Sequence, residues 1–526
     1  MTSERLTLSS PVIAILALCA IALALLQLQR ADDGLSITTS KVGTTPITIF
    51  RPQTGPSMPT VVIAHGFAGS QQLMQPFAMT LARNGYVAVT FDFLGHGRNP
   101  EPMRGDITKE TGITDALLAE LSAVANVAQS LPQSDGRLAV LGHSMASDVV
   151  VKFAQANPDV TATVAVSVFS KTVTATSPRN LLVIIGALEP KMLQDEGLRI
   201  VGLATKGAAA GPGQTYGRFE NGTARRLVEA RGVEHIGVLY SRDSLHETLD
   251  WLNGAFDRIG GGFVDARGKW LGLLFAGIIV LAWPLSHLLP AIRVRSRRAG
   301  MAWGPLLLAA LVPAVLTPLL LWKLPTDFLS ILLGDYLALH FLVYGALTAL
   351  MLMWLRRRQR AALAMHAALH ASPKRLAMAY HLWRNIAAAG LAVALFNIIA
   401  FGVPIDTYLF SFLPIPERWP LILAIACGTI PYFLADETLT ATANRNGGYA
   451  LTKLCFLLSL ALAILLNPAK LFFLAIIVPA ILLLFIAFGI ISRLSLRATG
   501  HPLPGAIANA AVFAWGIAVT FPMVVR

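Results

Sequence analysis

Cysteines and charged residues are both scarce in this chain. Three cysteines occur in 526 residues, and all of them lie inside apolar runs, at Cys19, Cys427 and Cys455. This placement excludes a disulfide framework, a thiol nucleophile and a cysteine-ligated metal from the polar part of the chain. Charged residues make up only 13% of the sequence and hydrophobic residues 55%, which lies outside the range of soluble globular proteins.

The formal net charge of +13 does not indicate nucleic-acid binding. The arginines cluster at the ends of apolar runs and are not interleaved with polar aromatic residues. Basic residues in such positions orient helices in a lipid bilayer. We therefore expect a membrane bilayer as partner and no nucleic acid.

The apolar excess lies mostly in the second half. The first 260 residues alternate polar and apolar segments like a globular domain, whereas long apolar runs separated by short arginine-bearing loops begin at Trp270. We predict an N-terminal membrane segment over residues 1–30, a globular domain over 31–262, and a membrane domain of about eight helices over 268–526.

The N-terminal apolar segment runs from Val12 to Leu26, with Arg5 before it and Arg30 after it. About 15 residues are few for a span, and a secretory signal is the competing interpretation. No small-residue cleavage site follows the run, which favours an uncleaved anchor; whether the segment is cleaved stays open.

Eight further apolar runs predict membrane spans, at about 270–289, 303–322, 335–355, 385–405, 420–434, 450–466, 471–491 and 503–525. The loops after alternate runs carry most of the basic residues: Arg293, Arg295, Arg297 and Arg298; Arg356 to Arg358, Arg360, Lys374, Arg375 and Arg384; Arg445 and Lys453; Arg493 and Arg497. The other loops hold little beyond Lys323, Arg418 and Lys470. The positive-inside rule places the rich loops in the cytoplasm, and hence the globular domain and the carboxyl terminus outside the cytoplasmic membrane.

The stretch from Leu138 to Val150 reads as a buried strand, a sharp turn of small residues and a helix. The turn Gly142-His-Ser144-Met-Ala146 has the context of a nucleophile elbow, which raises one serine above the edge of a sheet. The stretch resembles the elbow of the α/β-hydrolase family, which often reads Gly-His-Ser-Met-Gly. Ala146 departs from that pattern by one methyl group.

Alternating strands and helices surround this stretch, with predicted strands at 60–64, 87–92, 137–141, 161–168, 180–185 and 225–230. The alternation predicts a mostly parallel sheet covered by helices on both faces. The resemblance implies an α/β-hydrolase fold over roughly residues 45–260. The loop at 172–179 is too short for a large lid, so we expect an open site.

The resemblance also implies a catalytic triad in the order serine, acid, histidine, with Ser144 as nucleophile. Glu189 follows the strand at 180–185 where family members keep the acid, and His235 lies in the loop where they keep the base. The rival acids Asp195 and Glu196 fall inside a predicted helix, where we expect solvated surface charges. The rival base His246 falls inside the last predicted helix of this domain, where we expect a surface residue.

The oxyanion hole would use two backbone N–H groups, those of Phe67 and Met145. Phe67 follows His65-Gly66 after a buried strand, and Met145 follows the proposed nucleophile. We expect His143 to pack in the elbow and His96 to have no chemical role.

These residues favour a membrane-anchored serine hydrolase of the esterase, lipase or peptidase type, acting on an ester, thioester or amide. An acyltransferase with the same triad is a close alternative. A transporter-like protein with a hydrolase-like binding domain is a second one, because Asp335, His340, Asn397, Asp436 and Glu437 lie in apolar runs. We expect no cofactor and no metal, and a small-molecule or lipid acyl substrate whose identity the sequence leaves open. The eight additional spans either present a lipid-borne substrate or serve only as an anchor.

Overall fold

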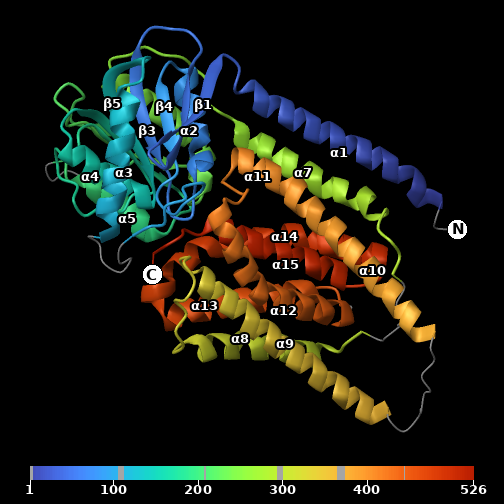
Figure 1. Cartoon of the computed structure of the whole chain (residues 1–526). Coiled ribbons are helices and arrows are strands. Elements are labelled where there is room, and N and C mark those ends of the chain that lie inside the picture. Colours follow the sequence, from blue (N-terminus) through green and yellow to red (C-terminus); the bar gives the residue numbers. More distant parts are fainter. Residues whose placement is uncertain are drawn as a thin grey trace.

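The computed structural model describes residues 4–104, 112–205, 209–292, 300–363, 374–443 and 445–525. A layered domain of strands and helices occupies one end of the molecule, and long helices form the rest (Figure 1). The predicted basic residues Arg293, Arg295, Arg297 and Arg298 lie outside the described residues.

The layered domain is built on one sheet of nine strands in the order β1-β2-β4-β3-β5-β6-β7-β9-β8. The strands from β4 to β9 pair in parallel, whereas the β1–β2 hairpin and β8 pair antiparallel at the two edges. The predicted mostly parallel sheet is confirmed; the two-residue strand β8 was not predicted. The bounds are β1 Leu35–Val42, β2 Thr45–Pro52, β3 Met58–Ala64, β4 Val87–Phe91, β5 Ser134–His143, β6 Val160–Val166, β7 Leu181–Gly186, β8 Thr215–Tyr216 and β9 Arg225–Ala230.

Helices cover both faces of this sheet, as the alternating pattern predicts. Successive residues of a strand point to opposite faces, so Val61 of β3 packs with α2 and α6, while its neighbour Val62 packs with α3 and α4. Helix α5 covers the far end of the second face. The bounds are α2 Gln75–Arg83, α3 Gly112–Gln129, α4 Met145–Ala156, α5 Lys191–Gly202 and α6 Arg242–Ala255. A 3₁₀ turn, η1 (Gln71–Met74), precedes α2.

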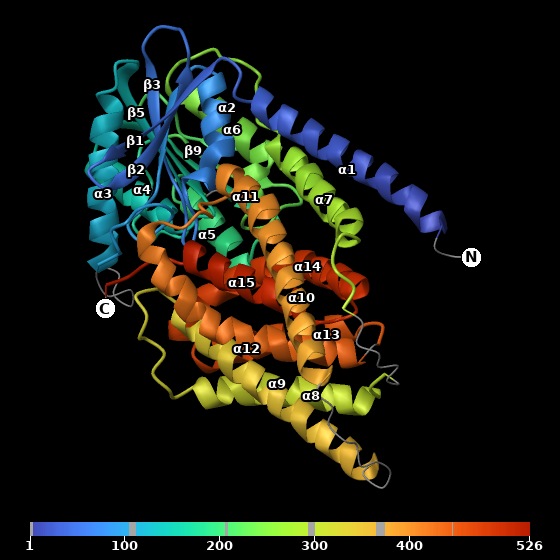
Figure 2. The ribbon, with the colours of Figure 1, turned by 45° about the vertical axis from the view of Figure 1, so that its right-hand side comes forward.

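Within the described residues, nine helical segments are long and apolar enough to cross a membrane. Helix α1 packs along α7, and the remaining helices form a bundle beside them (Figures 1 and 2). The predicted fourth run is a composite of α10, the π-helical turn η3 and α11. The bounds are α1 Glu4–Arg30, α7 Arg267–Ser286, α8 Trp303–Leu321, α9 Gly334–Leu363, α10 Lys374–Phe396, η3 Asn397–Phe401, α11 Gly402–Tyr408, α12 Trp419–Ala443, α13 Gly448–Leu466, α14 Pro468–Thr499 and α15 Leu503–Thr520.

Two expectations about the membrane half were wrong. The last helix does not reach Val525: it ends at Thr520, and the residues after it are extended and pair with the layered domain. Lys453, expected in a loop, is buried inside α13 and forms an ion pair with Asp436 of α12, because a lone ammonium group in an apolar bundle would be unstable.

Candidate active site

Ser144 lies at the sharp turn between β5 and α4. Its backbone adopts φ 55° and ψ −117°, a strained conformation for a residue with a side chain. A Cβ atom on Gly142 would lie 2.4 Å from the carbonyl oxygen of Ala146, so only glycine lets strand and helix cross this closely. The methyl group of Ala146 points into the core and is fully buried, which explains why alanine is accepted there.

A continuous chain of hydrogen bonds joins the three residues that the sequence singles out. His235 Nε2 lies 2.9 Å from Ser144 Oγ, and His235 Nδ1 lies 2.6 Å from Glu189 Oε1. The residues come from three loops at the carboxyl ends of β5, β7 and β9. Parallel strands bring these ends to one edge of the sheet, so residues 91 positions apart meet there.

Glu189 is held by two further hydrogen bonds. The backbone N–H of Gly186 donates to Oε2 at 3.0 Å, and the hydroxyl of Ser167 donates to Oε1 at 2.7 Å. Both donors stabilise the ionised carboxylate and fix its direction toward His235. Ser167 was not predicted, because a serine directly after a strand has no distinctive spacing in the sequence; in the structure it follows β6 at φ 55°.

The rival residues have other partners. Asp195 pairs with Lys191 on the exposed face of α5, and His246 pairs with Asp250 on α6. Glu196 was expected to be a solvated surface charge, and this expectation was wrong. It is buried, where it accepts hydrogen bonds from Arg199 and from the backbone N–H of Ser170.

Phe67 and Met145, expected to form the oxyanion hole, follow Gly66 and Ser144, which lie against each other. A Cβ atom on Gly66 would lie 3.0 Å from Ser144 Cβ and 3.0 Å from His143 Nδ1, so the glycine lets its loop press against the elbow. Among the described residues, no acceptor is found for the N–H of Phe67 or of Met145. The two groups are therefore available to an oxygen bound at Ser144.

Three buried histidines surround the elbow and its neighbouring loop. Burial lowers the pKa of His65, His96 and His143. The backbone N–H of Phe93 donates to His65 Nε2, and His96 Nδ1 lies 2.9 Å from the carbonyl oxygen of Leu94. The three imidazole rings are therefore neutral, and in this state their ring nitrogens form hydrogen bonds that hold the surrounding loops.

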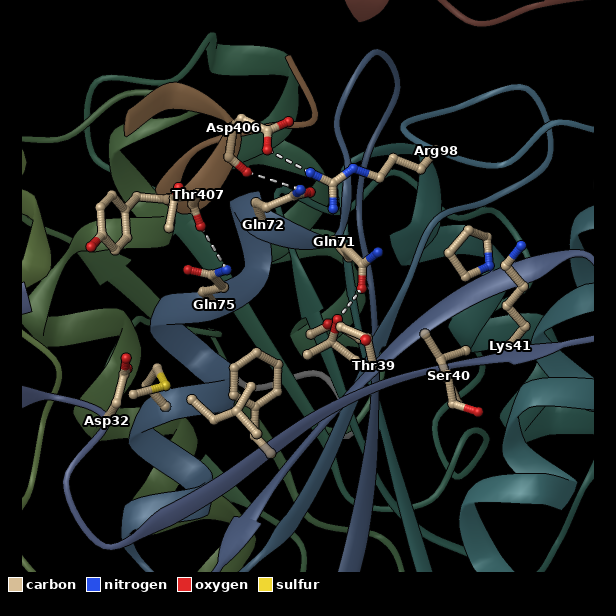
Figure 3. Close-up of a pocket in the computed structure, with 18 of the residues that line it drawn as sticks. Asp32, Thr39, Ser40, Lys41, Gln71, Gln72, Gln75, Arg98, Asp406 and Thr407 are labelled. Atoms are coloured by element: carbon tan, nitrogen blue, oxygen red, sulfur yellow. Dashed lines mark hydrogen bonds and ion pairs between the residues drawn. The ribbon is translucent and has the colours of Figure 1, made fainter. Parts of the chain in front are cut away.

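The loops after β3 and β4 dock on the membrane half through polar contacts. Ser70 Oγ accepts the backbone N–H of Ser411, and Gln72 Nε2 donates to the carbonyl oxygen of Asp406. The guanidinium of Arg98 pairs with the Asp406 carboxylate at 2.5 Å (Figure 3). A cavity of about 790 Å³ lies at this junction, between the β1–β2 hairpin, η1 and α11; Ser144 is not among its lining residues.

Arg418 is a deeply buried link between the two halves. It is 1% exposed, and its guanidinium donates to the carbonyl oxygens of Gly95, Ala518 and Phe521. The residues after α15 continue this contact with the loop after β4: the backbone N–H of Met523 donates to the carbonyl oxygen of Gly95, and the carbonyl oxygen of Met523 accepts the N–H of Met103. The expected open site is thus walled on one side by the membrane half.

Some polar residues inside the helical bundle pair with one another, whereas within the described residues the amide atoms of Asn397 and the Nε2 of His340 are buried without a hydrogen-bond partner. Asp436 pairs with Lys453, and Glu437 accepts a hydrogen bond from Asn509 at 3.0 Å. Asp335 accepts the backbone N–H of Phe328 and so lies at a helix end. In the described residues, no group of three or more histidine, cysteine, aspartate or glutamate side chains is arranged to hold a metal.

Comparison with known proteins identifies the layered domain. Residues 55–198 match the family model described as serine aminopeptidase, S33. No curated protein matches the chain.

Solved structures similar to the chain include a proposed dienelactone hydrolase from Klebsiella pneumoniae and a proposed CIB-like hydrolase from Thermoplasma acidophilum. Both are 16% identical to this chain, with a TM-score of 0.32. The match to the Klebsiella protein covers 43% of this chain and 100% of that protein, and the match to the Thermoplasma protein covers 42% of this chain and 99% of that protein. A hypothetical protein from Pseudomonas aeruginosa is 13% identical, with a TM-score of 0.32 over 43% of this chain and 94% of its own. Residues 55–198 of the layered domain thus resemble the serine aminopeptidase S33 family, and helices apolar enough to span a membrane follow this domain.

Proposed function

We propose that the chain is a membrane-anchored serine hydrolase that cleaves an ester, thioester or amide through an acyl-enzyme on Ser144. The observation that supports this most is the unbroken hydrogen-bond chain from Ser144 Oγ through His235 to Glu189. A hydroxyl is a weak nucleophile at neutral pH, and a histidine base oriented by a carboxylate activates it.

In the acylation step, Ser144 Oγ attacks the carbonyl carbon of the substrate while His235 Nε2 takes the hydroxyl proton. The carbonyl oxygen becomes an oxyanion, and the N–H groups of Phe67 and Met145 stabilise it. The tetrahedral intermediate collapses when His235 gives its proton to the leaving alcohol, thiol or amine. Glu189 stabilises the imidazolium throughout and does not itself take the proton.

In the deacylation step, a water molecule replaces the leaving group. His235 takes one proton from the water as its oxygen attacks the acyl carbon, and then returns a proton to Ser144 Oγ. An alcohol or amine acceptor in place of water would make the enzyme an acyltransferase, and product analysis in the presence of glycerol distinguishes the two reactions.

We further propose that the hydrolase domain lies outside the cytoplasmic membrane. It docks on the end of the bundle where α14 begins and α15 ends. The basic residues of α9 and α14, among them Arg356, Arg358, Arg493 and Arg497, lie toward the carboxyl ends of those helices, away from the hydrolase domain. Positive residues mark the cytoplasmic side.

A fluorophosphonate probe tests the nucleophile. It should label the full-length protein in membranes, and Ser144→Ala should abolish the label. The matched control is Ser122→Ala, which removes a serine hydroxyl on the outer helix α3 and should leave labelling intact. Persistent labelling of Ser144→Ala would contradict the proposal.

A further inference from the structure

Phe67 connects the proposed oxyanion hole to the membrane helices. Its ring centroid lies 4.6 Å from that of Phe473, which is in the second turn of α14. The buried ring of Phe521 lies 6.5 Å away, beyond the end of α15. A side chain from a membrane helix therefore packs on the residue whose N–H would hold the reacting oxygen.

Phe473 lies on the outer face of the bundle. Its side chain is 38% exposed, and the neighbouring Phe472 is 50% exposed. Side chains farther along α14, such as Leu483 at 67%, are exposed as well, as expected for a helix that faces lipid. One side of the Phe473 ring thus contacts Phe67, and its exposed side faces the region where the lipid would lie.

Exposed apolar side chains also follow the strands that carry Ser167, Glu189 and His235. They are within three residues of Ser167, Glu189 or His235 in the sequence, in the loops after β6, β7 and β9 and at the start of α5. This apolar rim consists of Phe169, Leu188, Met192 and Ile236, which are 45%, 66%, 53% and 40% exposed. Apolar residues gathered at one edge of a soluble-type domain mark a contact with a partner or ligand.

We propose that the enzyme takes its acyl group from a membrane-borne substrate with a long hydrocarbon chain, which lies on Phe473 and Phe67 as it reaches Ser144. The inference rests on the proposed function of Ser144 and names the substrate class. The chain leaves the bilayer along α14 and passes from one aromatic ring to the next, so it stays in apolar contact. The apolar rim offers the acyl chain further apolar surface near the triad.

The chemistry at Ser144 is unchanged by this route. Oγ forms a bond to the acyl carbon, the bond to the headgroup alcohol breaks, and that alcohol leaves with the proton from His235. Water then releases a free fatty acid. The reaction needs no oxidant, reductant or further co-reactant.

The test uses full-length protein in phosphatidylcholine vesicles and two esters, nitrophenyl acetate and nitrophenyl palmitate. The measured quantity is the ratio of kcat/KM for palmitate to kcat/KM for acetate. Phe473→Ala should lower this ratio about 10-fold or more, because the chain loses an apolar surface. Phe473→Leu, which keeps an apolar side chain, should restore much of it.

Phe472→Ala is the matched control, since Phe472 is a neighbouring exposed phenylalanine of α14 with no ring contact to Phe67. It should leave the ratio within about twofold of the wild type. An unchanged ratio in Phe473→Ala, or an equal loss on both esters, would overturn the inference. Acetate hydrolysis that survives Ser144→Ala would instead overturn the proposed function, so the two failures are distinguishable.

Discussion

The Nε2 atom of His143 lies 3.0 Å from the backbone carbonyl oxygen of His235. Burial, with a smaller effect of His235, lowers the pKa of His143 well below its usual range, so the ring is neutral and its Nε2–H is the donor. The residue before the proposed nucleophile thus holds the loop that carries the proposed base.

We expect His143 to be a positioning residue. His143→Ala should lower kcat about 10-fold with little change in KM, because one hydrogen bond to the His235 backbone is lost. His143→Gln, which can present an N–H at a similar distance, should recover part of kcat. Steady-state hydrolysis of nitrophenyl acetate measures both constants, and an unchanged kcat in the alanine variant would show that the loop is held by other contacts.

The triad should behave as a unit. Ser144→Ala and His235→Ala should each lower turnover on the order of 10⁴-fold, and Glu189→Ala should cost less. Ser167→Ala removes one of the donors to Glu189 and should cost about 10-fold. His246→Ala serves as control in the same assay; a large loss there with activity retained in His235→Ala would show that the base is His246.

Acid should destabilise the hydrolase domain. The pKa values of His65, His96 and His143 are lowered in the folded state, so below about pH 6.5 the unfolded chain binds more protons than the folded one. The stability that these neutral histidines contribute is present above that pH and is lost as the pH falls, by up to about 1.4 kcal/mol per pH unit for each histidine.

Hydrogen exchange of the strand amides at pH 7.5 and pH 5.5 measures this effect. His96→Gln should make the change in opening free energy smaller. Glu120 acts in the opposite direction, because burial raises the pKa of its carboxyl group to about 7. Between pH 4.5 and 7 the buried carboxyl group therefore lowers the free energy of unfolding increasingly as the pH rises. The same experiment on Glu120→Gln should therefore show a steeper loss on acidification, and a shallower one would contradict this assignment.

Arg418 should contribute more to the stability of the folded protein than an exposed loop arginine does. Arg418→Ala leaves the carbonyl oxygens of Gly95, Ala518 and Phe521 without their buried donor, so we expect a loss of stability of about 3 kcal/mol. Arg445→Ala is the control, because Arg445 is exposed and donates to a single carbonyl oxygen. Equal thermal unfolding midpoints for the two variants in detergent would contradict this.

The carboxyl terminus and the hydrolase domain should lie on one side of the membrane. Met523 and Val525 form main-chain hydrogen bonds with Gly95 and Met103, so both segments share one aqueous face. A phosphatase reporter fused after the last residue should be active outside the cytoplasm. A reporter that is active only in the cytoplasm would contradict the proposed position of the hydrolase domain outside the cytoplasmic membrane.

The meeting of Ser144, Glu189 and His235 could be predicted because the resemblance to the α/β-hydrolase family implies where the acid and the base follow their strands. Ser167 could not be, since a serine after a strand has no distinctive spacing. Arg418 was grouped with the few basic residues of the sparse loops, because nothing local in the sequence shows that a charge is buried. Its partners lie 100, 103 and 323 positions away.

The link between Arg418 and Gly95 also constrains how the protein is made. The loop after β4 is synthesised 323 residues before the arginine that holds it, and still earlier than the residues at 521–525 that pair with it. The hydrolase domain therefore emerges from the ribosome with one loop unsupported, and it acquires its final contacts only when the last helix has been inserted. We therefore expect the loop after β4 to reach its final structure only when the last helix is in place, and a chain stalled before residue 418 would lack the contact of Arg418 with Gly95.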